Sequence, residues 1–360
     1  MSYQRSSLTT LCHRRMATRT RPRDNKRPLT ADNMRWENWV AIQSDYWFIY
    51  SVWLFECLTQ IFFDIRPRMN IEDIDVPLPE QGSLWGAVNR SDWESFLEKQ
   101  SGGQASGDSL KKILYDADVM QQVMLETDGL LRILIMVTLF VEESTELHRT
   151  KSRLAERILN PSVLARTRNP TQQFLERGIP LRLQNLIKDM DADFNLLQPK
   201  LSVSPFGGDL SGMEACLYHE IQIIRHVRLQ GLYALTGWQA SKADVNIAER
   251  DFTLWLNGDK PTVRKCLWHA ATIFSTLYSR RHMTLWEPLC FLNGALFIWA
   301  YLMYADGKEI QAASAENALE SQKALRLDRL KHEDERDTWV EHGFNGNIHV
   351  TGIGNLLTRV

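Results

Sequence analysis

Apolar residues recur at helical spacing along most of this chain, whereas the strict alternation that indicates a strand is scarce. The longest continuous pattern runs from about Asp32 to Phe63 and predicts one long helix, with Asp32 or Asn33 as its N-cap and Pro67 stopping the pattern. The Trp and Phe side chains of this segment each bury a large area, so we expect them to dominate a core.

The rest of the chain predicts further helices. They are expected at about 84–100 with Ser91 as a cap, at 109–148 with a break at Gly129, and then at 213–236, 240–257, 261–281 and 286–305. Asn257-Gly258 followed by Pro261 matches a glycine after one helix and a proline at the start of the next. A polar helix with few apolar anchors is expected at about 308–341, followed by a glycine-rich end.

Proline and glycine mark the connections between these helices. Residues 64–82 are expected to form an extended connector, 101–107 a flexible loop, and 160–211 two short helices with loops. The predicted fold class is therefore all-α, an irregular multi-helix bundle with long buried Trp-rich helices and a Pro/Gly-rich central connector. We expect one helical domain over 32–305, any lobe boundary near 160–211, and 306–360 as the polar helix and loop-rich tail of the same domain.

The composition is that of a soluble globular protein with a sizeable core, with 360 residues, of which 44% are hydrophobic and 24% charged. A net charge of −2 argues against a chain that coats nucleic acid along its length. The head is basic, however, because Asp24 and Asp32 are outnumbered by Arg5, Arg14, Arg15, Arg19, Arg21, Arg23, Lys26, Arg27 and Arg35. Like charges repel, so residues 1–31 are expected to be a disordered head, and contact with DNA or an import receptor and a mitochondrial transit peptide are the alternatives.

The cysteines and the apolar runs indicate in which cellular compartment the protein resides and whether it crosses a membrane. Five cysteines, mostly in apolar helical contexts, favour free buried thiols in a reducing compartment: Cys12, Cys57, Cys216, Cys266 and Cys290. The apolar run Tyr46–Phe63 is interrupted by Glu56 and Gln60. The apolar run Cys290–Tyr304 is shorter than the ~20 residues that a membrane span needs. We interpret both as core helices of a soluble protein without a membrane.

A repeated Cys-x-x-His pattern is the sharpest metal hypothesis. Cys216 and His219, like Cys266 and His269, lie at i and i+3 on one helix face, and two such faces together could supply a tetrahedral zinc site. The alternative is that both are packed helix faces, since free cysteine is among the most buried residue types. Structural zinc usually joins closely spaced ligands on modules too small for a core, and this chain has ample core, so we favour packing.

Other chemical motifs are incomplete. Asp189, Asp191 and Asp193 start like a calcium loop, but Phe194 and Lys200 stand where glycine and glutamate are required. An all-α lyase or transferase would need a second metal-binding motif, and we find none. The sequence has no Gly-x-Ser-x-Gly or phosphate loop, and Gly352-Ile353-Gly354 is no dinucleotide fingerprint. We therefore predict a non-enzyme with no catalytic, cofactor-binding or metal-binding residues.

Basic residues near two predicted helix ends have structural explanations. Arg280 and Arg281, which precede His282, would favour a helix C-terminus through the macrodipole. His226, beside Arg225 and Arg228 on an apolar helix, is a modest candidate for contact with a ligand or partner.

Three blocks of the chain, in order, carry a resemblance to a known family. They are Trp36–Trp85, with Ser51–Cys57, Phe62–Met69 and Leu78–Glu80; Trp268–Leu277, followed by Ser279–His282 and Trp286–Pro288; and Trp339–Glu341 with Ile348–Gly354. Together they resemble the regulatory domain of fungal zinc-finger transcription factors, of the xylanolytic-activator type. The run Arg66-Pro67-Arg68 corresponds to the family's Pro-Pro turn, with Arg66 in place of one proline.

The resemblance implies the role. In the family this domain follows a DNA-binding zinc module, regulates its activity and resides in the nucleus. Cys12 is the one thiol before residue 35, so zinc is expected only in a missing N-terminal finger, and the family continues beyond a point near Val360. The expected function is a transcription regulator that acts through protein contacts, on transcriptional machinery or regulatory proteins or as a homodimer, with weak DNA binding by itself. A small-molecule-sensing helical domain, with a pocket between Trp-rich helices, and an all-α lyase or transferase are the alternatives.

Overall fold

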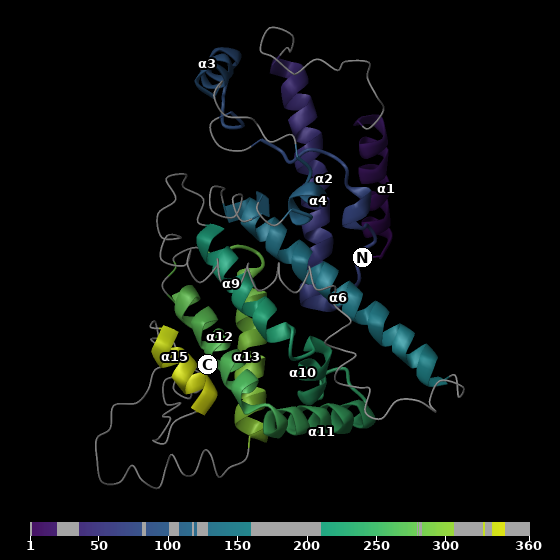
Figure 1. Cartoon of the computed structure of the whole chain (residues 1–360), viewed down its shortest axis with the longest axis vertical. Helices are drawn as coiled ribbons and strands as arrows, with labels where there is room; N and C mark the ends of the chain where they lie inside the picture. Colours follow the sequence, from purple (N-terminus) through teal and green to yellow (C-terminus); the bar gives the residue numbers. More distant parts are fainter. Residues whose placement is uncertain are drawn as a thin grey trace. The chain divides into compact units, whose positions relative to one another are not determined.

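The fold was taken from a computed structural model of the chain (Figure 1). The structure describes residues 2–19, 36–80, 84–100, 108–116, 119–120, 129–159, 210–278, 280, 283–305, 327 and 333–342. Over these ranges the regular secondary structure is helical, and the extended backbone contributes one isolated bridge, between Pro77 and Ser109. The prediction of an all-α fold is confirmed.

Contacts along the chain define two compact units. The N-terminal unit comprises Met1–Ile61 and Ile65–Gly208, and the C-terminal unit comprises Phe62–Asp64 and Asp209–Val360. Nearly all of the predicted lobe boundary, 160–211, lies outside the described residues, as does most of the predicted tail, so the domain limits given above stay predictions.

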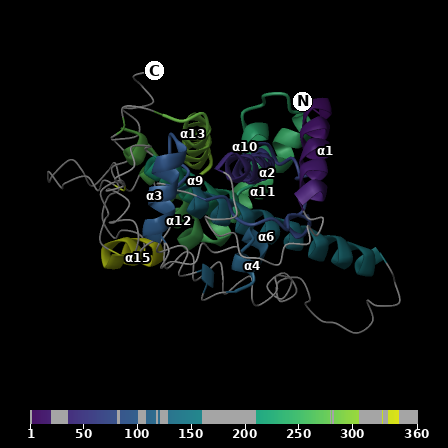
Figure 2. The ribbon, with the colours of Figure 1, turned by 90° about the horizontal axis from the view of Figure 1, so that it is seen from above.

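In the N-terminal unit, helix α2 (Trp36–Phe63) is the central element, and α6 (Gly129–Leu159) crosses it (Figures 1 and 2). At the crossing, Trp53 Nε1 donates to Thr138 Oγ1 over 2.9 Å, and both side chains are buried. Further along, Gln60 Nε2 donates to Ser144 Oγ over 3.0 Å. The Trp-rich segment is therefore a core helix, and two of its buried polar groups, Trp53 Nε1 and Gln60 Nε2, find partners on the helix beside it.

The basic head departs from its prediction. Residues Ser2–Arg19 form helix α1, which lies along α2 in both views (Figures 1 and 2). Thr9, Cys12 and Met16, spaced by three and four residues, are buried on one face of α1. Arg15 pairs with Asp45 of α2 over 2.8 Å and lies over the Phe48 ring. The expectation of a disordered head is thus wrong for these residues, because a buried stripe and an ion pair outweigh repulsion between like charges.

A second aromatic core holds the short helix α3 (Arg90–Gln100) against the N-terminal half of α2. Trp39 contacts Trp93 and Trp85 with ring centroids 5.7 and 6.3 Å apart, and Trp85 contacts Trp47 at 5.9 Å. The predicted start of α3 at Leu84 and the predicted cap Ser91 are wrong. Asn89 is the capping side chain, since its Oδ1 accepts the Asp92 amide over 2.9 Å.

The connector after α2 is fastened to the helices around it. Tyr50 Oη donates to the Val76 carbonyl over 2.7 Å and accepts the Leu110 amide over 3.1 Å, so one buried hydroxyl joins α2, the connector and α4 (Leu110–Leu114). Helix α4 is capped by Ser109 and ends at Leu114, so the predicted continuous segment from Ser109 to a break at Gly129 is wrong.

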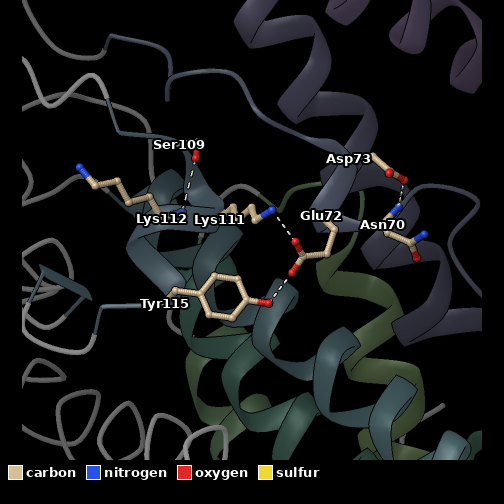
Figure 3. Close-up of polar contacts among 7 residues, drawn as sticks. All are labelled: Asn70, Glu72, Asp73, Ser109, Lys111, Lys112 and Tyr115. Carbon is tan, nitrogen blue, oxygen red and sulfur yellow. Dashed lines mark hydrogen bonds and ion pairs between the residues drawn. The ribbon is translucent and has the colours of Figure 1, made fainter. Parts of the chain in front are cut away.

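A second fastening joins the 3-10 turn η2 (Ile71–Asp73) to α4. The Glu72 carboxylate accepts from Lys111 Nζ over 2.5 Å and from the Tyr115 hydroxyl (Figure 3). Asp73 accepts the Asn70 amide within the turn itself, as Figure 3 also shows. These charges lie near the surface, so they hold an otherwise extended segment in place without building a buried site.

The C-terminal unit is built around α12 (Lys260–Tyr278). This helix contacts four others: α9 (Leu210–Ile224), α11 (Lys242–Gly258), α13 (Glu287–Tyr304) and α15 (Glu333–His342). The predicted helix 213–236 is instead two helices, because the chain turns at Arg225–Arg228 before α10 (Leu229–Leu235). Apolar residues continue through the turn, and Val227 is buried there, so the sequence pattern hides the break.

Candidate functional site

The two Cys-x-x-His faces meet in the core of the C-terminal unit. His219 of α9 and His269 of α12, here called the histidine pair, approach with their Nδ1 atoms 2.8 Å apart, and both rings are buried. Cys216 and Cys266 are buried as well. Within the ranges that the structure describes, no three His, Cys, Asp or Glu side chains are grouped so as to hold a metal ion. The structure thus brings together two of the four hypothetical zinc ligands as a hydrogen-bonded pair.

The short Nδ1–Nδ1 distance limits the tautomers that a neutral pair can adopt. Two nitrogen atoms form a hydrogen bond only if one carries hydrogen and the other offers a lone pair, so we assign one ring as the Nδ1–H tautomer and the other as the Nε2–H tautomer. Burial, with a contribution from Arg336, lowers the pKa of His219 to about 3. Burial also lowers the pKa of His269 far below its usual range. The pair is neutral at physiological pH.

Aromatic side chains enclose the pair. The Trp268 ring lies 4.8 Å from His269 and 5.4 Å from His219, centroid to centroid, and Tyr218 contacts both imidazoles edge-on. The Arg336 guanidinium of α15 also lies over the Trp268 ring, 4.9 Å from its centroid. Neither imidazole Nε2 has a hydrogen-bond partner in the described part of the chain.

A second buried polar network lies between α9, α13 and α10. Asn293 Nδ2 donates to Glu220 Oε1 over 2.7 Å, and Tyr233 Oη donates to Asn293 Oδ1 over 2.9 Å. Burial raises the pKa of Glu220 to about 8, and the hydrogen bond from Asn293 partly opposes this rise. Glu220 is therefore largely neutral near pH 7, and its Oε2 has no partner among the described residues. Sequence reasoning missed this network, although one carboxylate in an apolar helix and one amide in an apolar partner were visible signals.

The α12–α13 junction holds a buried ion pair. Arg280 pairs with Glu287 at the start of α13, with 7% and 0% of the two side chains exposed, and Glu287 also accepts the Thr284 amide. The prediction that Arg280 stabilises a helix C-terminus through the macrodipole is therefore incomplete, because its guanidinium forms an ion pair with the Glu287 carboxylate. Arg281 and His282 lie outside the described residues.

The thiols offer little nucleophilic chemistry. Burial raises the pKa of Cys216 and of Cys266 to about 12 and that of Cys12 to about 11. Burial likewise raises the pKa of Cys57 and of Cys290 well above the usual range. Because the thiolate is the reactive form, all five behave as packed apolar side chains.

The remaining sequence candidates are scattered. His226 lies in the turn after α9, where partial burial and the charges of Lys265 and Arg225 lower its pKa. At the Arg66-Pro67-Arg68 run, the Arg68 amide donates to the buried Glu56 of α2 over 2.9 Å. The motifs at 189–193 and 352–354 lie outside the described residues, so neither the calcium-like segment nor the lyase alternative is tested.

One helix in the part that the structure describes, α2, is long and apolar enough to cross a bilayer. In its most apolar window 61% of the residues are buried inside the protein. Core helices of soluble proteins share this length and composition, so the observation is weak support for a membrane span.

Comparison with known proteins gives one informative relative. A protein of Gibberella fujikuroi named "Transcription factor" is 22% identical over 324 residues, which cover 90% of this chain and 36% of that protein. The chain thus spans about a third of the length of this relative. No protein-family model matches the chain, and no solved structure does. The comparison supports a transcription regulator in general terms, consistent with the resemblance of the three sequence blocks.

Proposed function

We propose that this chain is the regulatory region of a transcription regulator of the fungal zinc-finger type. It acts in the nucleus on transcription by RNA polymerase II, through contacts with transcriptional machinery or regulatory proteins. The observation that carries the proposal is the alignment of 90% of the chain with a protein named "Transcription factor". DNA recognition and zinc binding belong, on this proposal, to a separate finger module.

The chemistry of the described core supports a role without catalysis. Its thiols have raised pKa values, its histidine pair is neutral, and its buried Glu220 and Glu287 are each engaged by neighbouring side chains. The pKa values of the thiols and of the histidine pair lie far from pH 7, and burial withholds all of these groups from a substrate, so they suit interior packing better than proton transfer. The proposed activity therefore lies in protein contacts.

A tethering experiment tests this proposal. The full chain is fused to a heterologous DNA-binding domain, and transcription of a reporter with the matching operator is measured in a fungal host. We expect reporter output to change at least threefold against the DNA-binding domain alone, in either direction. The matched control is a fusion of the Gly212→Val variant, which disturbs the core of the C-terminal unit at an unchanged sequence length. Equal output from all three proteins would contradict the proposal.

Two further measurements address location and DNA. A fluorescent fusion of the full chain is expected to concentrate in the nucleus, and exclusion from it would count against the proposal. Binding of the chain alone to duplex DNA, measured by anisotropy at 50 and 200 mM salt, is expected to be weak and sequence-independent. Tight binding to one sequence would place DNA recognition in this chain.

One observation favours a second candidate, a small-molecule-sensing helical domain. Three buried atoms between α9, α12 and α13 lack partners among the described residues, namely the Nε2 atoms of the histidine pair and Glu220 Oε2. Buried polar groups in native proteins are usually satisfied, so a small polar solute is a reasonable occupant. A thermal-shift screen against metabolites tests it, since a ligand that binds the folded state alone raises the melting temperature.

A further inference from the structure

Helix α15 lies along α12 with a narrow contact face (Figures 1 and 2). Trp339 is its buried anchor. Arg264 of α12 donates through Nε to the Val340 carbonyl and through Nη2 to the Glu341 carbonyl, each over 2.7 Å. These carbonyls belong to the last turn of α15, which has no further helical N–H to bond. A single cation thus caps the helix and holds it on α12.

The third contact joins α15 to the histidine pair. Arg336 lies over the Trp268 ring, and the same indole contacts both imidazoles. Arg336 also pairs with Asp337 of its own helix over 2.8 Å, on the exposed side. Trp268 is therefore a shared neighbour that links the cation of α15 to the two buried imidazoles.

The charges that act on the pair are positive. Arg336 of α15 acts on both rings, and Lys265 of α12 and His226 after α9 act on His269. From α13, Asn293 engages the one carboxylate beside His219 in the sequence, Glu220, and this carboxylate is largely neutral near pH 7. A proton added to the pair would therefore place a positive charge near the Arg336 guanidinium, in a buried environment where charges interact strongly.

We propose that α15 is a pH-sensitive strap, which docks on α12 while His219 and His269 are both neutral and is released when the pair is protonated. The two events are linked reciprocally: docked Arg336 disfavours the proton, and the proton weakens docking by the same factor. Release would uncover Trp268 and Arg264, an aromatic and cationic face of α12, and would expose Trp339 of α15. This inference is independent of the proposed function.

The expected size of the effect follows from the linkage. Once the strap is released and water reaches the pair, an imidazole titrates no higher than its ordinary pKa of about 6.5. Each pH unit below the undocked pKa then lowers the docking equilibrium about tenfold for one titrating group. With an undocked pKa of about 6.5, we expect the docked-to-released ratio to fall between pH 7.5 and 5.0 by about tenfold to thirtyfold, the latter being the upper limit for one titrating group.

Distance measurements between nitroxide labels on the full chain test the strap. Labels are placed by Glu335→Cys on α15 and Asn257→Cys at the end of α11, both exposed positions. The native thiols are buried, so labelling is selective. We expect one narrow distance distribution at pH 7.5 and a second, broader population at pH 5.0 that disappears when the pH is returned to 7.5. An unchanged distribution at pH 5.0 would overturn the proposal.

Two variants assign the effect to the proposed groups. In His219→Gln/His269→Gln, amide side chains replace the titrating rings, and we expect the narrow distribution at both pH values. In Arg336→Met, an apolar cover stays over Trp268 without the charge, and the pH response is expected to weaken, because burial still disfavours the proton while the contribution of Arg336 is lost. Release that persists unchanged in either variant would assign it to other groups, such as exposed His342, and would overturn the proposal. Circular dichroism checks the fold, and Arg336→Met, which leaves the core intact, decides the matter if the double variant does not fold.

Discussion

Among the glycines that the structure describes in the C-terminal unit, Gly212, near the start of α9, has the least room for a side chain. A methyl group added there would lie 1.5 Å from Arg280 Nη1, 2.3 Å from its Cζ and 2.6 Å from its Cδ. The helix backbone cannot move away easily, because α9 is packed on both α12 and α13. Gly212→Ala is therefore expected to push the guanidinium of Arg280 out of its place beside Glu287.

The cost follows from what Arg280 neutralises. Glu287 is fully buried and its side chain accepts from Arg280 and from the Thr284 amide. Removing one partner of a buried ion pair costs about 3–5 kcal/mol, since the other charge is left without compensation. Alanine is a better helix former than glycine by about 1 kcal/mol, which offsets part of the loss. We expect Gly212→Ala to lower the free energy of unfolding by about 2–4 kcal/mol.

Urea unfolding of the full chain, followed by circular dichroism, measures this change. Gly231→Ala in α10 is the matched control, because a methyl group at Gly231 meets no atom within 4 Å, and it should be neutral or stabilising by up to about 1 kcal/mol. In a background that already carries Arg280→Ala, Gly212→Ala should add little further loss. The steric reasoning is refuted if Gly212→Ala has the same effect on stability as Gly231→Ala. It is also refuted if the effects of Gly212→Ala and Arg280→Ala are fully additive.

Four other predictions concern buried polar groups and thiols. Tyr50→Phe should destabilise the N-terminal unit by about 1–3 kcal/mol in urea unfolding, because the carbonyl and the amide that the hydroxyl bridges lose a partner, and an unchanged midpoint would contradict this. The pKa of Glu220 is raised from 4.5 to about 8, so its contribution to the free energy of unfolding is complete below pH 4.5 and is lost as pH rises through about 8. In Glu220→Gln, the free energy of unfolding should depend less on pH over this range. The pKa of His219 is lowered, so the free energy of unfolding should fall as pH drops from about 6.5 toward 3. This fall should be smaller in the His219→Gln/His269→Gln variant, and an equal fall in both proteins would count against the pair. The five buried thiols should react with a thiol reagent at pH 8 only after denaturant is added, and fast labelling of the native chain would show them to be accessible.

The sequence was a good guide wherever structure depends on neighbours along the chain. The helical period predicted α2, α11, α12 and α13 nearly to their observed ends, and Asn257-Gly258 before Pro261 marks the junction of α11 and α12. It failed where packing overrides a local signal. The charge block of the head predicted disorder, yet Cys12 and Met16 give α1 a stripe that is buried in the fold.

The candidate site shows the same division. The repeated Cys-x-x-His spacing singled out His219 and His269 among nine histidines, but their meeting as a hydrogen-bonded pair was not predicted. The Glu220 network was missed, because a carboxylate in an apolar helix carries no mark of its partner in the sequence.

By itself, the sequence determined that this protein is helical, which faces of its helices are apolar and that its thiols are buried, since these properties follow from the spacing of residues along one helix. Only the tertiary structure decided which buried polar groups meet, such as two imidazoles 50 residues apart or Arg280 held between Gly212 and Glu287. The reason is physical. The helical period fixes the direction of a side chain relative to its own axis, whereas its partner depends on where two axes cross, and the pKa of a buried group depends on the water that this crossing removes.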